Sequence, residues 1–129
     1  MEGLNFSFPV KAPYEISKYY GENHKAIDIV GQGYNSPILS VSDGYVYKTS
    51  YDSMYGNQII IRHQNNIYSI YSHLNNILVM QGTEVDKGKK IGTMGSTGMT
   101  TGVHLHFSIF TGDPLSEIEY EDPLKYLKK

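Results

Sequence analysis

The sequence predicts a small all-β domain, an antiparallel β-sandwich or barrel-like fold with a short irregular N-terminal segment. Short apolar stretches alternate with turns that contain Gly, Asn or Asp, which is typical of strands joined by tight connections. No stretch shows sustained helical periodicity. Tyrosine, which favours strands, occurs 12 times in the 129 residues.

The length fits a single domain. We expect residues 1–22 to be irregular, because Pro9 and Pro13 interrupt regular structure. Residues 23–112 are expected to form the core of the domain, and residues 113–129 a C-terminal tail. No linker, low-complexity tract or internal repeat divides the chain.

The first strands are expected in residues 26–51. In "AIDIV", residues 26–30, Ile27 and Ile29 share one face and Asp28 lies on the other. Residues 37–42 and 44–51 flank an Asp-Gly turn, and we expect them to pair as a hairpin.

A second hairpin is expected from residues 57–63 and 67–74, which flank the polar turn "QNN". Regularly spaced glycines in residues 82–98 predict very short strands or tight loops. Near the end of the chain, Asp122 and Pro123 predict one helical turn, with Asp122 as its N-cap.

The stretch "GVHLHFSIF", residues 102–110, carries two histidines on a predicted strand. Side chains alternate along a strand, so the apolar residues Leu105, Phe107 and Ile109 share one face. The other face carries His104, His106 and Ser108. Two imidazoles about 6–7 Å apart along the strand can converge on one zinc ion. The alternative is a half-exposed strand with two solvated histidines.

A second pattern, "HKAID", places His24 four residues before Asp28. On an extended segment these side chains face the same way, and they offer a nitrogen and a carboxylate oxygen to a metal. With His106 they make three protein ligands, which is the pattern of a catalytic zinc with one open position. The chain has no Cys, so a metal site here must use His and carboxylate. Alone, His24 could equally be a loop histidine and Asp28 a strand-edge carboxylate.

The motifs "HKAIDI", "YSHL" and "GSTGMTTGVHLHF", in this order, resemble the lysostaphin/LytM-type zinc metallo-endopeptidases, which hydrolyse bacterial peptidoglycan peptides. The resemblance runs from residue 24 to 110, with a looser match in "DPLKYL". It implies a catalytic groove in which His24, Asp28 and His106 bind one Zn²⁺ ion, while His73 and His104 carry out catalysis.

Two positions depart from the family pattern. Ala26 stands where the family commonly has Gly, and Ser108 stands where it commonly has Glu. Family members that have lost zinc ligands act as scaffolds or activators. All five positions are present here, so the resemblance implies an active enzyme.

The catalytic base is expected to be a histidine, because the Glu of an H-E-x-x-H motif is absent. Imidazole has an unperturbed pKa of about 6.5, close to a neutral working pH. We assign His73 and His104 to proton transfer and to stabilising the oxyanion. Ser69, Tyr71 and His73 are expected to share one face of their strand, directed at the pocket.

The fifth histidine and four of the tyrosines are not expected to take part in catalysis. His63, at the end of "IIIRH", is expected to be a hydrogen-bonded or exposed strand-end residue without a catalytic role. Tyr20, Tyr34, Tyr55 and Tyr71 are weaker predictions for groove walls, because strand packing explains them equally well.

Composition limits the partners. A net charge of −2 argues against nucleic acid. No stretch resembles a signal peptide or a membrane span. We expect a monomer, or a module of a larger protein, that acts outside the cell or at the cell wall as a secreted or virion-associated enzyme. Its expected substrate is a peptidoglycan peptide, with glycine-rich bridges as a leading option.

Two alternatives use the same residues differently. One is a non-catalytic domain that binds the cell wall or acts as a scaffold. The other is a barrel-type carrier or phosphotransfer domain, which the glycine cadence of residues 79–95 also allows. A carrier needs a modifiable Lys at a hairpin tip, and phosphoryl transfer needs two His but not Asp28.

Overall fold

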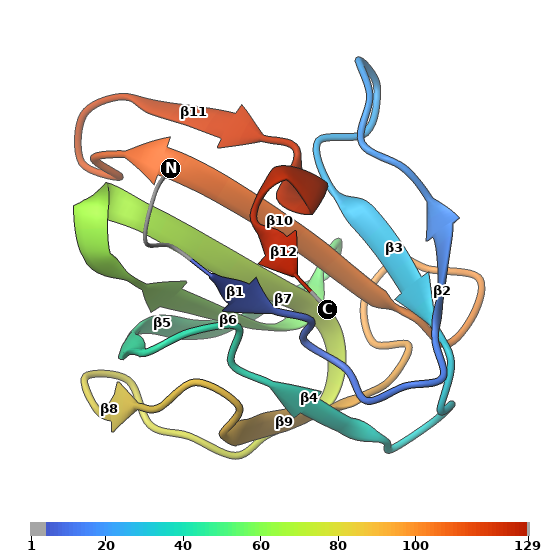
Figure 1. Cartoon of the computed structure of the whole chain (residues 1–129). Coiled ribbons are helices and arrows are strands. Elements are labelled where there is room, and N and C mark those ends of the chain that lie inside the picture. The colour runs from blue at the N-terminus through green and yellow to red at the C-terminus, as the bar shows by residue number, and fades with distance from the viewer. Residues whose placement is uncertain (1–4, 129) are drawn as a thin grey trace.

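The computed structural model describes residues 5–128, which form an antiparallel β-domain without an α-helix in that range (Figure 1). The predicted all-β class is confirmed. The main path of the large sheet has seven strands: β2 (Glu15–Lys18), β3 (Ile27–Val30), β10 (Leu105–Gly112), β7 (Ile67–Ile77), β6 (Gly56–Arg62), β5 (Gly44–Asp52) and β8 (Glu84–Val85).

Five further strands complete the described part of the domain. Strand β11 (Ile118–Glu121) pairs with β10, while β9 (Lys90–Met94) joins β4 (Pro37–Leu39) to the end of β7. Strands β1 (Phe6–Ser7) and β12 (Leu127–Lys128) form a separate parallel pair that crosses one face of the large sheet (Figure 1). The N-terminal segment, expected to be irregular, therefore contains two short strands, β1 and β2.

The core lies on the face of the sheet that β1 and β12 cover. Alternation decides which side chains reach it, as predicted for the two strands that carry the motifs. Ile27 and Ile29 of β3 are completely buried. The apolar side chains of β10 that are completely buried are Leu105, Phe107 and Ile109. The opposite face is therefore free to carry polar groups, and it includes Asp28 and His106.

Two of the predicted local structures are confirmed. Strands β6 and β7 form the hairpin around a 3₁₀ turn at Gln64–Asn66. A second 3₁₀ turn begins at Pro123, and the Asp122 carboxylate caps it by accepting a hydrogen bond from the Leu124 backbone N–H at 3.0 Å.

The predicted hairpin around Asp43 and Gly44 is wrong, because β4 pairs with β9 and β5 pairs with β6 and β8. The Asp43 carboxylate accepts a hydrogen bond from the Lys87 backbone N–H at 2.7 Å. Gly44 packs against the Arg62 carbonyl so closely that a Cβ would clash. These two residues direct the chain from one strand set to the next and do not close a turn.

None of the helical turns in the described residues is long and apolar enough to cross a bilayer.

Candidate metal centre

Asp28 and His106 meet because their strands are neighbours. Strand β3 pairs with β10, and the register places Asp28 directly opposite His106. Both side chains point away from the buried apolar residues that precede and follow them in their strands. The two motifs, 78 residues apart in sequence, thus come together by strand pairing.

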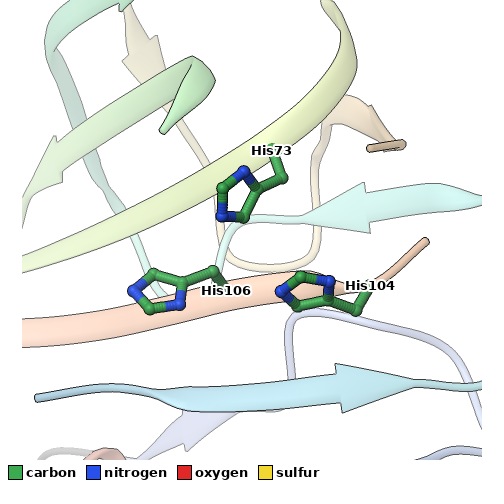
Figure 2. A group of neighbouring side chains, drawn as sticks. All are labelled: His73, His104 and His106. Atoms are coloured by element: carbon green, nitrogen blue, oxygen red, sulfur yellow. The ribbon is translucent and has the colours of Figure 1, made fainter. Parts of the chain in front are cut away.

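One carboxylate oxygen lies at the centre of the cluster. Asp28 Oδ1 is 3.0 Å from His106 Nδ1, 3.3 Å from His24 Nε2 and 3.7 Å from His104 Nε2. The ligand atoms of His24, Asp28 and His106 all lie within 4.8 Å of one another. The same is true of His73 on β7, His104 just before β10 and His106 on β10, whose rings face one another (Figure 2).

Backbone carbonyls orient three of the four rings. The Nδ1 atoms lie 3.2 Å from the Tyr19 carbonyl in His24, 3.2 Å from the Gly102 carbonyl in His104, and 2.7 Å from the Thr97 carbonyl in His73. A carbonyl only accepts, so each Nδ1 carries the proton and each Nε2 lone pair remains for the cluster. His106 is turned the other way, with Nδ1 toward Asp28.

These atoms fit zinc chemically. Two imidazole nitrogens and one carboxylate oxygen form a donor set that catalytic zinc uses. Hydrogen bonds from the second ring nitrogen to carbonyl oxygens, as in His24, are the usual way in which a ligating histidine is held in one tautomer.

His73 reaches the cluster by a different route from the predicted one. Ser69 and Tyr71 face the core and are completely buried, so the shared pocket-facing side predicted for them is wrong. Alternation would send His73 into the core as well. Its left-handed backbone conformation, with φ of 63°, coincides with a β-bulge opposite Gln58 and turns the ring to the other face.

Burial shapes the protonation of the cluster. Burial alone would raise the pKa of Asp28, but the hydrogen bond from His106 and the fields of His104, His106 and His24 outweigh it and lower the pKa. For His73, which is only 5% exposed, burial is the largest influence and lowers the pKa, although the hydrogen bond to the Thr97 carbonyl opposes it. Asp28 is therefore ionised and His73 neutral at neutral pH.

The cluster lies in a groove on the polar face of the sheet. One cavity, of about 460 Å³, is lined by His73, His104, Met54 and Met99. A second, of about 360 Å³, is lined by Gln58, Ser72, Ser108 and Tyr120. Both cavities share His24, Tyr55 and His106. Two of the candidate metal ligands, His24 and His106, thus lie with Tyr55 at the border between the two cavities.

Sequence reasoning missed several groove residues. Ser72 and Gln58, joined by a hydrogen bond of 2.9 Å, are on the groove face of β7 and β6. Strand alternation could have found Ser72, had the bulge been recognised. Tyr55, named as a wall residue, does line the groove, whereas Tyr71 is buried in the core.

His63 lies away from the cluster, as expected. It is 5% exposed, and both its nitrogens have partners: Nδ1 is 2.8 Å from the Asp43 carbonyl and Nε2 is 2.8 Å from the Ser69 hydroxyl. Burial lowers its pKa.

Comparison with known proteins identifies relatives over most of the chain. The sequence model of Peptidase family M23 matches residues 22–117. The peptidoglycan DD-endopeptidase ShyC of Vibrio cholerae is 43% identical over 84 residues, which are 65% of this chain and 19% of that protein. The murein hydrolase activator NlpD of Escherichia coli is 40% identical over 99 residues, which are 75% of this chain and 26% of that protein.

Solved structures agree with the fold. Lysostaphin from Staphylococcus simulans superposes with a TM-score of 0.79 at 28% identity, covering 88% of this chain and 49% of that chain. The catalytic domain of the prophage-encoded M23 protein EnpA from Enterococcus faecalis superposes with a TM-score of 0.80 at 26% identity, covering 94% of this chain and 97% of that chain.

Among the curated relatives, the chain spans only 19% of ShyC and 26% of NlpD.

Proposed function

The chain belongs to peptidase family M23, and from that premise we propose that it is a zinc-dependent endopeptidase that hydrolyses peptide bonds of bacterial peptidoglycan, in the cross-bridge or the stem peptide. The observation that carries the proposal is the cluster itself. Five side chains with the chemistry of a metal site and of proton transfer converge within a groove.

In this proposal His24 Nε2, Asp28 Oδ1 and His106 Nδ1 would hold one zinc ion, and three protein ligands are the number that a catalytic zinc uses. Bound zinc supplies a Lewis acid that activates water and polarises the scissile carbonyl. The lowered pKa of Asp28 keeps its carboxylate ionised, which is the form that binds a metal.

His73 and His104 supply the proton chemistry. The neutral imidazole of His73 carries its hydrogen on Nδ1, so Nε2 is free to accept a proton. His104 is oriented in the same way by the Gly102 carbonyl. One ring takes the proton of the attacking water. The other, when protonated, donates a hydrogen bond to the carbonyl oxygen as charge builds on it, and a proton then passes to the leaving amine.

The groove supports an endopeptidase. Cavities lie on both sides of the shared residues His24, Tyr55 and His106, so a chain can extend in both directions from the bond that is cut. The uncharged floor formed by Gln58, Ser72 and Ser108 offers hydrogen bonds to a peptide backbone. The enzyme acts where its substrate lies, at the cell wall, as a secreted or virion-associated protein or a module of a larger one.

An activator is the second candidate function, because the murein hydrolase activator NlpD is nearly as similar to the chain as the endopeptidase ShyC. Overall identity does not separate the two functions. The complete set of five side chains favours the enzyme, since a partner-binding role alone would not require a carboxylate surrounded by three imidazoles.

The test is digestion of purified peptidoglycan sacculi, of both the glycine-bridged and the directly cross-linked type. The protein is compared in its zinc-loaded form, after chelation, and as His104→Ala. We expect one zinc per chain by metal analysis, new peptide amino termini by mass spectrometry with the zinc-loaded protein alone, and no cleavage by the other two forms.

Two results would overturn the proposal. Equal cleavage by all three forms would show that the cluster is not the catalytic site. No cleavage of either wall type by the zinc-loaded protein, together with stimulation of an added murein hydrolase, would assign the chain to the activators.

A further inference from the structure

His73 adopts a backbone conformation that an isolated strand would not supply. Its φ of 63° is left-handed, a conformation that residues with a Cβ rarely adopt. Yet this conformation turns the ring from the core face toward His104 and His106. The chain must therefore contain contacts that hold His73 in place.

Two hydrogen bonds from outside β7 hold it. The His73 backbone N–H donates to the Tyr55 carbonyl at 2.7 Å, and its Nδ1–H donates to the Thr97 carbonyl at 2.7 Å. Tyr55 belongs to the turn between β5 and β6, and Thr97 to the loop that leads to β10. His73 thus depends on two separate loops.

The side chain of Thr97 fixes the second of these loops. Its hydroxyl donates to the Leu74 carbonyl at 2.6 Å and accepts from the Asn57 backbone N–H at 3.1 Å. Leu74 directly follows His73, and Asn57 pairs with Leu74 across the bulge. The threonine therefore joins the loop to both strands beside the irregularity that turns His73.

The two loops also touch each other. The Met99 backbone N–H donates to the Met54 carbonyl at 2.8 Å. Gly56 and Gly98 both have positive φ, and a Cβ on Gly56 would clash with Thr97, as would one on Gly98 with Gly56. Only glycine allows such close approach, so the position of the Thr97 carbonyl is set within a narrow range.

We propose that Thr97 is a positioning residue for His73: its hydroxyl anchors the loop so that its carbonyl holds the His73 ring in the Nδ1–H tautomer, with Nε2 facing His104 and His106. The importance of this tautomer for hydrolysis rests on the function proposed above. The tautomer itself is a property of the metal-free protein and can be measured without any activity.

The test compares Thr97→Val with Thr97→Ser. Valine keeps the shape but removes both hydrogen bonds of the hydroxyl, whereas serine keeps both. In long-range ¹H–¹⁵N NMR spectra of the metal-free protein at neutral pH, we expect one Nδ1–H tautomer for His73 in the wild type and in Thr97→Ser. Thr97→Val should show mixed or exchange-broadened signals, with His73→Gln spectra assigning the resonances.

Hydrolysis gives the second readout. Thr97→Val should lower kcat about 10–100-fold, the usual cost of losing an outer partner of a site histidine, with KM little changed. Its zinc content should stay at one per chain, because the three proposed ligands are untouched. Thr97→Ser should restore kcat.

Thr93→Val is the matched control. The Thr93 hydroxyl also accepts from a backbone N–H, that of Asn76 at 3.1 Å, but it makes no hydrogen bond to a residue of the cluster. It should lose stability without altering the His73 tautomer or kcat. The proposal is overturned if Thr97→Val keeps a single Nδ1–H tautomer, or if Thr93→Val disturbs His73 as much. An inactive wild type would refute the proposed function and leave the NMR result to decide this one.

Discussion

His63 and His73 are two buried histidines of the same hairpin, β6–β7, and they differ in the hydrogen bonds of their ring nitrogens. Each is 5% exposed, and burial lowers the pKa of each. His63 has protein partners on both nitrogens. Among the described residues, His73 has a hydrogen-bond partner on Nδ1 alone. The two histidines are thus alike in burial and differ in whether the second ring nitrogen has a hydrogen-bond partner, and only His73 is proposed to be catalytic.

His63 belongs to a series of neutral groups that are hydrogen-bonded to one another. The Asp43 carbonyl accepts from Nδ1–H, so Nε2 is the acceptor for the Ser69 hydroxyl, which also lies 2.8 Å from the Tyr71 hydroxyl. The Val41 backbone N–H donates to Tyr71 at 3.1 Å. Burial raises the pKa of Tyr71 to about 12, so that its hydroxyl stays protonated. Each of these hydrogen-bonded groups therefore has a protein partner, and neither nitrogen of His63 is open to a substrate or a metal.

The largest expected effect on activity comes from replacing His73, the histidine with an unpartnered Nε2. Under the proposed mechanism, His73→Gln removes one of the two rings assigned to proton transfer, and hydrolysis of peptidoglycan should fall about 10²–10⁴-fold, the usual contribution of a positioned acid or base. Zinc content, measured by atomic absorption, should remain one per chain. Activity within tenfold of the wild type would show that His73 has no such role.

The matched replacement of His63 should lower stability and leave activity unchanged. His63→Ala leaves the Asp43 carbonyl and the Ser69 hydroxyl without their partner and opens a cavity beside Phe6, whose ring centroid is 4.9 Å away. We expect a loss of roughly 2–4 kcal/mol in the free energy of unfolding, measured by urea titration, with the activity of the folded protein unchanged. A fall in kcat at a temperature where the variant is folded would contradict the distinction.

The lowered pKa of His63 also predicts how the free energy of unfolding depends on pH. His63 is neutral in the folded protein because its pKa is lowered, but it has a pKa of about 6.5 when unfolded. Below that value the unfolded chain binds a proton that the folded chain refuses. Its contribution is therefore complete above pH 6.5 and is lost as the pH falls, by at most about 1.4 kcal/mol per pH unit.

The measurement is urea unfolding of the metal-free protein from pH 7.5 downward, with His63→Gln as the control. The variant should show a shallower decline, and the difference between the two curves isolates His63 from the other titrating groups. Parallel curves would mean that His63 binds protons equally in both states.

The smallest effects come from two serines on opposite faces of β7. Ser69→Ala removes the donor to His63 and should lower the free energy of unfolding by about 1–2 kcal/mol without changing hydrolysis. Ser72→Ala, on the groove face, removes the acceptor of the Gln58 amide and should cost a similar amount of stability, but it should also raise KM roughly threefold if the peptide backbone binds there. The reverse assignment of effects would mean that the two faces have been confused.

Local patterns predicted much of the fold because they depend on neighbours in the chain. Alternation in residues 26–30 and 103–110 placed the apolar side chains in the core and Asp28 with His106 on the other face. The Asp122 cap and the "QNN" turn also follow from local chemistry. The hairpin at Asp43 was wrong because β4 finds its partner, β9, some 50 residues later.

The all-β class, the five residues proposed for the site and their resemblance to the zinc peptidases could be predicted from the sequence, because residue types and spacings are local properties. The folded structure was needed to find that Asp28 lies opposite His106, that a bulge turns His73 out of the core, and that the Thr97 carbonyl accepts a hydrogen bond from its ring. Those features arise from strand register and from contacts between loops distant in the chain, which no local pattern encodes.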